Sequence, residues 1–146
     1  MKEFLVRSPT ATLGGLVYFG RMIDKIRAQA RSELPPDYQP NLGKGFDAKC
    51  CAFLHIDYNE LAERANQGGT DDDLLEWAFT AGRRPSEAEI EMWNEFMRKF
   101  GWRDKASEIL ERRKREGGLS ERADIETMFQ FIDADEGRSP SPQATG

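Results

Sequence analysis

The chain of 146 residues is long enough for one domain with its own core, and its nine Phe, three Trp and three Tyr need such an interior. Its 26 acidic and 21 basic side chains give a formal net charge of −5, which argues against a general affinity for nucleic acid or anionic membranes. No apolar run approaches the ~20 residues that span a bilayer, and the first ten residues lack the apolar core of a signal peptide, so we expect a cytoplasmic protein.

The first half of the chain predicts three helices and a proline-rich loop. From Thr12 to about Ser32, apolar side chains follow the 3-4-3-4 spacing of one helical stripe: Leu16, Phe19, Ile23, Ile26 and Ala30. Gly14 and Gly15 fall in its first turns, where they are poor helix formers but allow close approach of backbone or ligand. Residues 35–46 hold three prolines and two glycines and are read as a loop. Short helices at about 47–55 and 58–67 follow, the second capped by Asp57.

The second half predicts three or four more helices. Thr70 with Asp73, and Ser86 with Glu89, are capping patterns that begin helices at 71–81 and at 87 to about 100. Residues 104–116 form a mostly exposed helix, and about 121–134 form the last one. No convincing strand pattern appears. We therefore predict an all-α fold, a compact single-domain bundle of six or seven helices over residues 1–138, with a disordered tail at 139–146.

Cysteine and histidine limit the available chemistry. The two cysteines, Cys50 and Cys51, are adjacent, so a disulfide between them would be strained, and we interpret them as small hydrophobic residues of a buried helix. His55 is the only histidine. A zinc site needs four ligands, and a nucleophilic cysteine needs a base with an orienting partner. We predict no metal and no cofactor.

Two charged runs are interpreted as ordinary helix features. Asp71, Asp72 and Asp73 lack the spacing of a calcium loop, and three acids in a first helical turn are favoured by the helix dipole. The basic run 112–115 is surrounded by Glu108, Glu111 and Glu116 and has no interleaved aromatic residues, so we expect a solvated helix face and no nucleic-acid binding.

The candidate site is a polar cluster on the first predicted helix. Arg21 and Lys25 are one turn apart, so their head groups can converge on one anion, while Asp24 can orient the guanidinium of Arg21. The alternatives are a structural ion network and a solvated face. Acids at a helix C-terminus are opposed by the dipole and need partners, so we expect cations of the first helix to face Asp133, Asp135 and Glu136.

The spacing LGG-x₅-RM-x-DK, from Leu13 to Lys25, together with Trp93-Asn94 and the closing segment 124–138, resembles the bacterial family known as domain of unknown function 5069. The resemblance covers about residues 7–138. The family has no settled activity to carry over. The resemblance adds weight to Arg21, Asp24 and Lys25 as a site, with Asn94, Asp133, Asp135 and Glu136 as supporting residues.

Two functions remain open. The first is a small-molecule-binding protein, which could also be an enzyme, that holds an anionic ligand through Arg21 and Lys25. The second is a protein–protein interaction module or a homodimer that uses an exposed apolar helix face. Its interface anchors would be Trp77, Trp93 and Trp102. The position of Arg21, in a buried site or in open solvent, discriminates between them.

Overall fold

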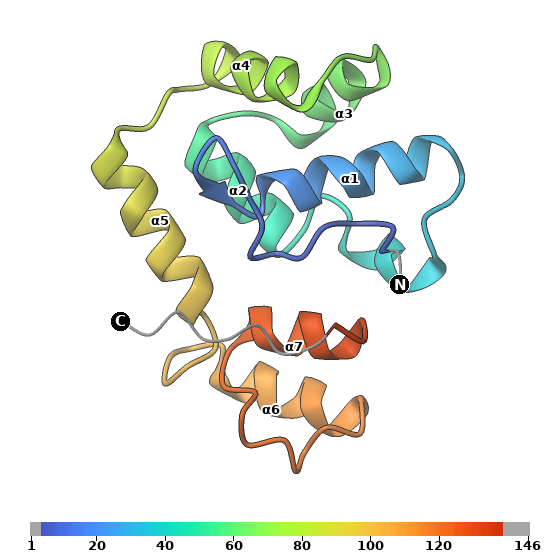
Figure 1. Cartoon of the computed structure of the whole chain (residues 1–146), viewed down its shortest axis with the longest axis vertical. Helices are drawn as coiled ribbons and strands as arrows, with labels where there is room; N and C mark the ends of the chain where they lie inside the picture. Colours follow the sequence, from blue (N-terminus) through green and yellow to red (C-terminus); the bar gives the residue numbers. More distant parts are fainter. Residues whose placement is uncertain (1–3, 139–146) are drawn as a thin grey trace. The chain divides into compact units, whose positions relative to one another are not determined.

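The computed structural model describes residues 4–138, which gather into two compact units, residues 4–92 and residues 93–138. This part of the chain has seven α-helices, one 3-10 helix and one short hairpin, so the fold class is all-α, as predicted (Figure 1). None of the helices in residues 4–138 is long and apolar enough to cross a membrane. The elements are β1 (Thr12–Leu13), β2 (Leu16–Val17), α1 (Phe19–Ala30), η1 (Pro36–Asn41), α2 (Phe46–Leu54), α3 (Tyr58–Asn66), α4 (Asp71–Ala81), α5 (Glu87–Lys99), α6 (Ser107–Glu116) and α7 (Met128–Asp135).

The prediction that the first helix begins near Thr12 is wrong. β1 and β2 form an antiparallel hairpin in which Thr12 pairs with Val17 and Leu13 with Leu16. The two-residue turn is Gly14-Gly15, with φ of 59° and 83°. Glycine reaches these positive values without strain, and such turns match the twist of a hairpin. A Cβ on Gly14 would also lie 2.2 Å from Leu75 Cδ2, so the turn approaches α4 closely.

α1 is the central element of the first unit. Its apolar stripe is buried as predicted at Phe19, Ile23 and Ile26, whereas Ala30 is exposed. α3 packs against α1, and α4 packs against α3 (Figure 1). A smaller apolar cluster of Val6, Ala28 and Leu34 joins the N-terminal segment and the start of the proline-rich loop to α1.

The short-range capping signals are confirmed. Thr70 and Asp73 form a reciprocal capping box at the start of α4, and Ser86 and Glu89 exchange the same two bonds at α5. The Asp57 side chain accepts from the backbone N–H of Glu60 at α3. Helices α2 to α5 begin and end within about one residue of their predicted bounds.

The second unit begins within α5 and contains α6 and α7, which pack against each other. Its core includes Leu110, Ile125 and Phe131. α6 begins later than predicted because residues 101–106 form a turn. In this turn the Asp104 carboxylate accepts hydrogen bonds from the backbone N–H groups of Gly101 and Ala106.

α7 also begins later than predicted, because Thr127 and Gln130 form its capping box. Ile125 is buried ahead of the helix and not within it. The predicted disordered tail, residues 139–146, lies outside the described residues. That residues 1–138 act as one domain stays a prediction.

Candidate functional site

The two cations of the candidate site are buried. Arg21 is 5% exposed and Lys25 is 4% exposed. By contrast, Arg31, at the C-terminal end of α1, is exposed to solvent. Burying a charged side chain is costly unless it makes ion pairs and hydrogen bonds. The interpretation of Arg21 and Lys25 as a solvated helix face is therefore wrong.

Lys25 belongs to a buried triad that we define as Tyr18, Lys25 and Asp47. Its Nζ lies 2.8 Å from Asp47 Oδ1 and donates to the Tyr18 hydroxyl at 3.0 Å. The Tyr18 hydroxyl in turn donates to Asp47 Oδ1 at 2.6 Å. The backbone N–H of Gly43 donates to the other carboxylate oxygen at 3.0 Å. The triad thus connects the hairpin, α1, α2 and the loop before α2.

The environment of the triad keeps Tyr18 protonated. Burial raises the pKa of Tyr18 well above its ordinary value, and the negative charge of Asp47 adds to the effect. The charge of Arg21 acts in the opposite direction, which places Arg21 in the same electrostatic cluster. Tyr18 also has a positive φ of 77° immediately before α1. This conformation is strained for a bulky residue. The hydrogen bonds of the Tyr18 hydroxyl with Lys25 and Asp47 hold the residue in it.

Arg21 lies on α1 between the N-terminal segment and η1. Its Nη1 donates to the backbone carbonyl of Arg7 at 3.0 Å. Its Cζ lies 5.8 Å from the ring centroid of Tyr38. The guanidinium therefore contacts two segments of the first unit, the N-terminal segment and η1.

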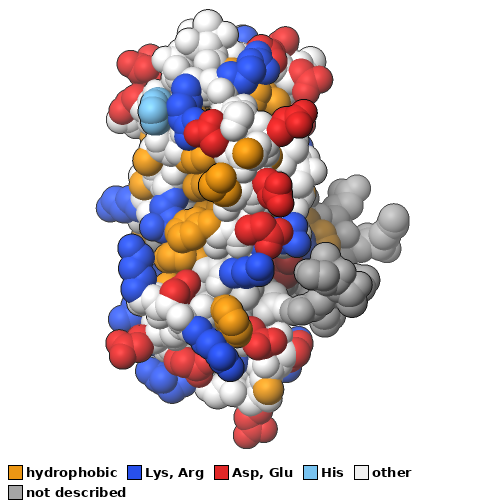
Figure 2. Space-filling model, turned by 90° about the vertical axis from the view of Figure 1, so that its left-hand side faces the viewer, with side chains coloured by type: hydrophobic (Ala, Val, Ile, Leu, Met, Phe, Trp, Pro, Cys, Tyr) orange, Lys and Arg blue, Asp and Glu red, His pale blue; other side chains and the backbone are white. Residues whose placement is uncertain are grey.

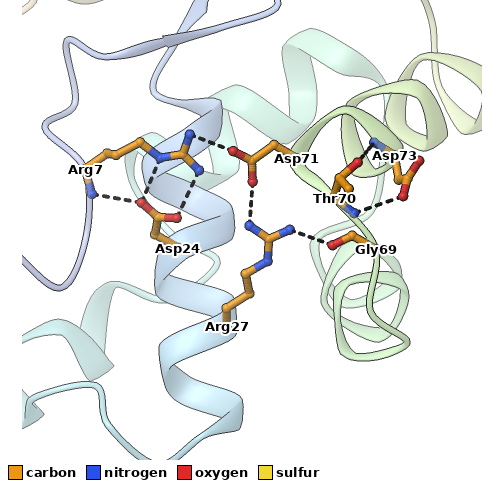
Figure 3. Close-up of polar contacts among 7 residues, drawn as sticks. All are labelled: Arg7, Asp24, Arg27, Gly69, Thr70, Asp71 and Asp73. Carbon is orange, nitrogen blue, oxygen red and sulfur yellow. Dashed lines mark hydrogen bonds and ion pairs between the residues drawn. The ribbon is translucent and has the colours of Figure 1, made fainter.

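A second group, which we call the ion-pair cluster, comprises Arg7, Asp24, Arg27 and Asp71 (Figure 3). Asp24 accepts three hydrogen bonds from Arg7: from its backbone N–H at 2.9 Å, from Nε at 2.9 Å and from Nη2 at 3.0 Å. The Asp71 carboxylate accepts a hydrogen bond from Arg7 Nη1 at 3.0 Å and another from Arg27 Nη1 at 2.6 Å. The cluster joins the N-terminal segment, α1 and the first turn of α4.

These contacts stabilise the charged forms. The hydrogen bonds that the Arg7 side chain donates to Asp24 raise the pKa of Arg7. The hydrogen bond that Arg27 donates lowers the pKa of Asp71, with Arg7 adding to the effect. Gly20 makes the geometry available, since a Cβ there would lie 2.9 Å from Arg7 Cζ. Only a residue without a side chain lets the Arg7 guanidinium lie this close to α1.

The predicted trio is thus divided between two networks. Lys25 pairs with Asp47, Asp24 binds Arg7, and Arg21 donates to the Arg7 carbonyl. Sequence reasoning missed Tyr18 and Asp47, because they approach Lys25 from other elements. Arg7 lies at the start of the range that the resemblance covers, and no local sequence signal assigns it a role.

The supporting residues lie in the second unit. Asn94 is half-buried on α5, Asp133 is buried, and Asp135 is exposed at the end of α7. The C-terminal acids do have a cationic partner, as the dipole argument requires: Arg138 pairs with Asp133 at 3.5 Å and with Glu136. Their approach to the cations of α1 stays a prediction.

The two cysteines lie in a buried helix, as predicted. Cys50 and Cys51 are free and buried in α2, and Cys51 Sγ lies 3.9 Å from Met22 Sδ. Burial raises the pKa of Cys51 to about 12 and that of Cys50 well above its ordinary value, so neither is a thiolate near neutral pH. His55 is exposed at the C-terminus of α2. Within residues 4–138, no group of three or more His, Cys, Asp or Glu is arranged to hold a metal ion.

The two charged runs are only partly solvated. Asp71, Asp72 and Asp73 form the first turn of α4 as predicted, but Asp71 also serves the ion-pair cluster. In the basic run, Lys114 is 4% exposed, and its Nζ donates to the carbonyls of Arg122 and Ile125. Lys114 is therefore hydrogen-bonded to the loop before α7. Only the other residues of the run, Arg112, Arg113 and Arg115, form the predicted solvated face.

The tryptophans differ in exposure. Trp93 is buried, Trp77 is partly buried, and Trp102 is 45% exposed. Figure 2 shows basic and acidic side chains interspersed over the displayed face, with hydrophobic side chains between them. No single sign of charge dominates that view. The large hydrophobic residues that are exposed include Met92, Phe96, Trp102 and Ile109.

The fold and the two networks define a small all-α protein with a buried polar centre on its first long helix. The family profile described as Domain of unknown function (DUF5069) matches residues 3–138, so the chain belongs to this family. The resemblance seen in the sequence is confirmed. No curated protein is significantly similar to the chain.

Proposed function

We propose that the protein binds a small anionic ligand, with Arg21 as the contacting group and Lys25 as a second positive charge one helical turn away. The observation that carries this proposal is the burial of two cations, Arg21 and Lys25, one turn apart on α1. A buried guanidinium recognises carboxylate or phosphate through paired N–H donors, which an ammonium cannot reproduce.

The surrounding charges support this proposal. Tyr18 is neutral, Asp47 is the counter-charge of Lys25, and Arg21 acts electrostatically on the same cluster. Arg21 and Lys25 thus bring two positive charges to one buried region of α1, which suits the binding of an anion. Lys25 acts from a fixed position, because Asp47 and Tyr18 hold its ammonium.

A thermal-shift screen of the full chain against carboxylates and phosphate esters tests the proposal. A ligand at 100 times its dissociation constant stabilises the folded state by about 2.7 kcal/mol, which is readily detected. We expect Arg21→Gln to abolish the stabilisation by any compound that stabilises the wild-type protein. Equal stabilisation of both proteins would contradict the proposal, as would a screen in which no anion stabilises the wild type.

Arg31→Gln is the matched control. It removes one positive charge from the end of the same helical segment, where Arg31 pairs with Glu33 in the open. We expect this variant to respond to ligand as the wild type does. Lys25→Met is a poorer probe because it also breaks the buried pair with Asp47 and so changes stability on its own.

A second proposal, an interaction module, is supported by α5. Met92 is 67% exposed and Phe96 is 50% exposed, one turn apart on that helix. An apolar pair on the solvent side of a helix suits a protein partner or a second copy of the chain. Sedimentation of the wild type and of Phe96→Ser over a range of concentrations tests self-association. A monomer at every concentration would contradict the homodimer.

We also propose a cytoplasmic location. Cys50 and Cys51 are free thiols. Cysteines stay reduced in the cytosol, whereas oxidising compartments favour disulfides. Fractionation of the cells that produce the protein tests this, and recovery outside the cytosolic fraction would contradict it.

A further inference from the structure

We infer that Arg7 is a positioning residue for Arg21, acting through its own backbone carbonyl. Arg21 Nη1 donates to that carbonyl at 3.0 Å, although the two residues are 14 positions apart in the sequence. The inference rests on the proposed anion site, because it concerns how the contacting guanidinium of that site is held.

Residue 7 is held by one carboxylate at both its main chain and its side chain. Asp24 accepts from the Arg7 backbone N–H, from Nε and from Nη2, all at 2.9–3.0 Å (Figure 3). The N–H belongs to the peptide group before Arg7 and the carbonyl to the one after it. The main-chain and side-chain contacts together therefore hold the Cα of residue 7, from which the carbonyl projects, and loss of the side-chain contacts loosens it.

The remaining guanidinium nitrogen of Arg7 is held from α4. Nη1 donates to Asp71, whose other oxygen receives Arg27. The Arg7 guanidinium also lies against α1 at Gly20, because a Cβ on Gly20 would be only 2.9 Å from Arg7 Cζ. Arg7 is therefore fixed by three parts of the first unit: Asp24 on α1, the surface of α1 at Gly20, and the first turn of α4.

This arrangement gives Asp24 an indirect route to Arg21. The sequence suggested that Asp24 orients Arg21 from the same helix, and the contacts show Asp24 holding Arg7, whose carbonyl receives Arg21. A guanidinium that is oriented before the ligand arrives loses less conformational entropy when it binds. Loosening Arg7 should therefore mobilise Arg21 and weaken anion binding, although Arg7 need not contact the anion.

Nuclear magnetic resonance of arginine side chains in the unliganded full chain tests the inference. The Arg21 signals are assigned by their loss in Arg21→Lys. Arg7→Ala removes the Arg7 guanidinium but keeps the carbonyl. We expect exchange of the Arg21 guanidinium hydrogens with water to become about tenfold faster, as for the loss of one charge-assisted hydrogen bond. An unchanged exchange rate in folded Arg7→Ala would overturn the inference.

Three further variants keep the result interpretable. Arg31→Ala breaks the exposed pair with Glu33 and should leave Arg21 exchange unchanged. Arg7→Lys can bind Asp24 at one point but lacks the planar fork, so it should restore part of the protection. If Arg7→Ala does not fold, Asp71→Asn takes its place, since it loosens Arg7 and leaves Asp24 intact; unchanged exchange there would equally overturn the inference.

A titration with inorganic phosphate and with acetate separates this inference from the proposed function. Slower exchange at Arg21 in the wild type, with less effect in Arg7→Ala, would support both. If neither anion slows exchange at Arg21 but Arg7→Ala still speeds it, Arg7 positions Arg21 as inferred, and the anion-binding proposal loses its support.

Discussion

The ammonium of Lys25 lies 2.8 Å from the carboxylate of Asp47, and both side chains are almost completely removed from water. The Tyr18 hydroxyl accepts a hydrogen bond from Lys25 and donates one to Asp47. The backbone N–H of Gly43 donates to the other oxygen of the Asp47 carboxylate. A buried pair of this kind contributes little net stability over an apolar pair, but removing one partner leaves an uncompensated charge. The triad therefore determines which single substitutions the first unit tolerates.

We expect Lys25→Met and Asp47→Asn each to destabilise the protein, by about 3 kcal/mol, because each leaves the other charge buried without its partner. The double variant should lose clearly less than the sum, since both charges are then removed together. Urea denaturation of the four proteins gives the coupling free energy. A coupling within the ~0.2–1 kcal/mol range of exposed pairs would contradict the role of a buried ion pair.

Gly82 should tolerate no side chain. A Cβ at this position would lie 1.9 Å from the carbonyl oxygen of Leu54 and 2.8 Å from that of His55, and backbone atoms cannot move away cheaply. We expect Gly82→Ala to cost about 3 kcal/mol or more. Gly68→Ala is the matched control: its Cβ meets open space, so only the positive φ of 91° is penalised, at about 1 kcal/mol. Equal losses of melting temperature in the two variants would refute this account.

Sequence reasoning succeeded where the signal is local. Capping pairs such as Thr70 with Asp73 form within one turn, so their bonds follow from spacing alone. The hairpin was not predicted because the apolar stripe of α1 continues backward through Leu16, so the helical period extends over the Gly14-Gly15 turn. Two glycines between short apolar runs are a hairpin signal that could have corrected it.

The candidate site was only partly predictable for a related reason. The spacing of Arg21, Asp24 and Lys25 showed which residues share a helix, but not which segments fold back onto them. Asp47 reaches Lys25 from α2, and Arg7 reaches Asp24 from the N-terminal segment. Helical period carries no information on these long-range pairs. It also could not show that Lys114, within a basic run, is the buried residue of that run.

The thiols of α2 predict a fall of stability at alkaline pH. The pKa of Cys51 is raised from 9.0 to about 12 by burial, so between these values the folded protein keeps a proton that the unfolded chain has lost. The free energy of unfolding should therefore decrease as pH rises from about 9 to 12, by up to about 1.4 kcal/mol per pH unit for this one group. Denaturation at several pH values measures the slope.

Cys51→Ala provides the control for the alkaline slope. Lysines and tyrosines titrate in the same range, so the informative quantity is the difference in slope between wild type and variant. We expect a shallower fall in Cys51→Ala, whatever its stability at neutral pH. The same slope in both proteins would show that the Cys51 thiol does not contribute.

Lys114 gives a prediction for the second unit. Its Nζ donates to the carbonyls of Arg122 and Ile125 at 2.9 and 3.0 Å, so Lys114→Met keeps the apolar stem but leaves both acceptors without this donor. Because hydrogen bonds from charged donors contribute about 1.5–3 kcal/mol, we expect a loss in this range, measured by urea denaturation. Arg113→Met removes an exposed charge from the same run and should change stability by less than about 0.5 kcal/mol. If the two variants were equally stable, the loop before α7 would not depend on the two hydrogen bonds that Lys114 donates.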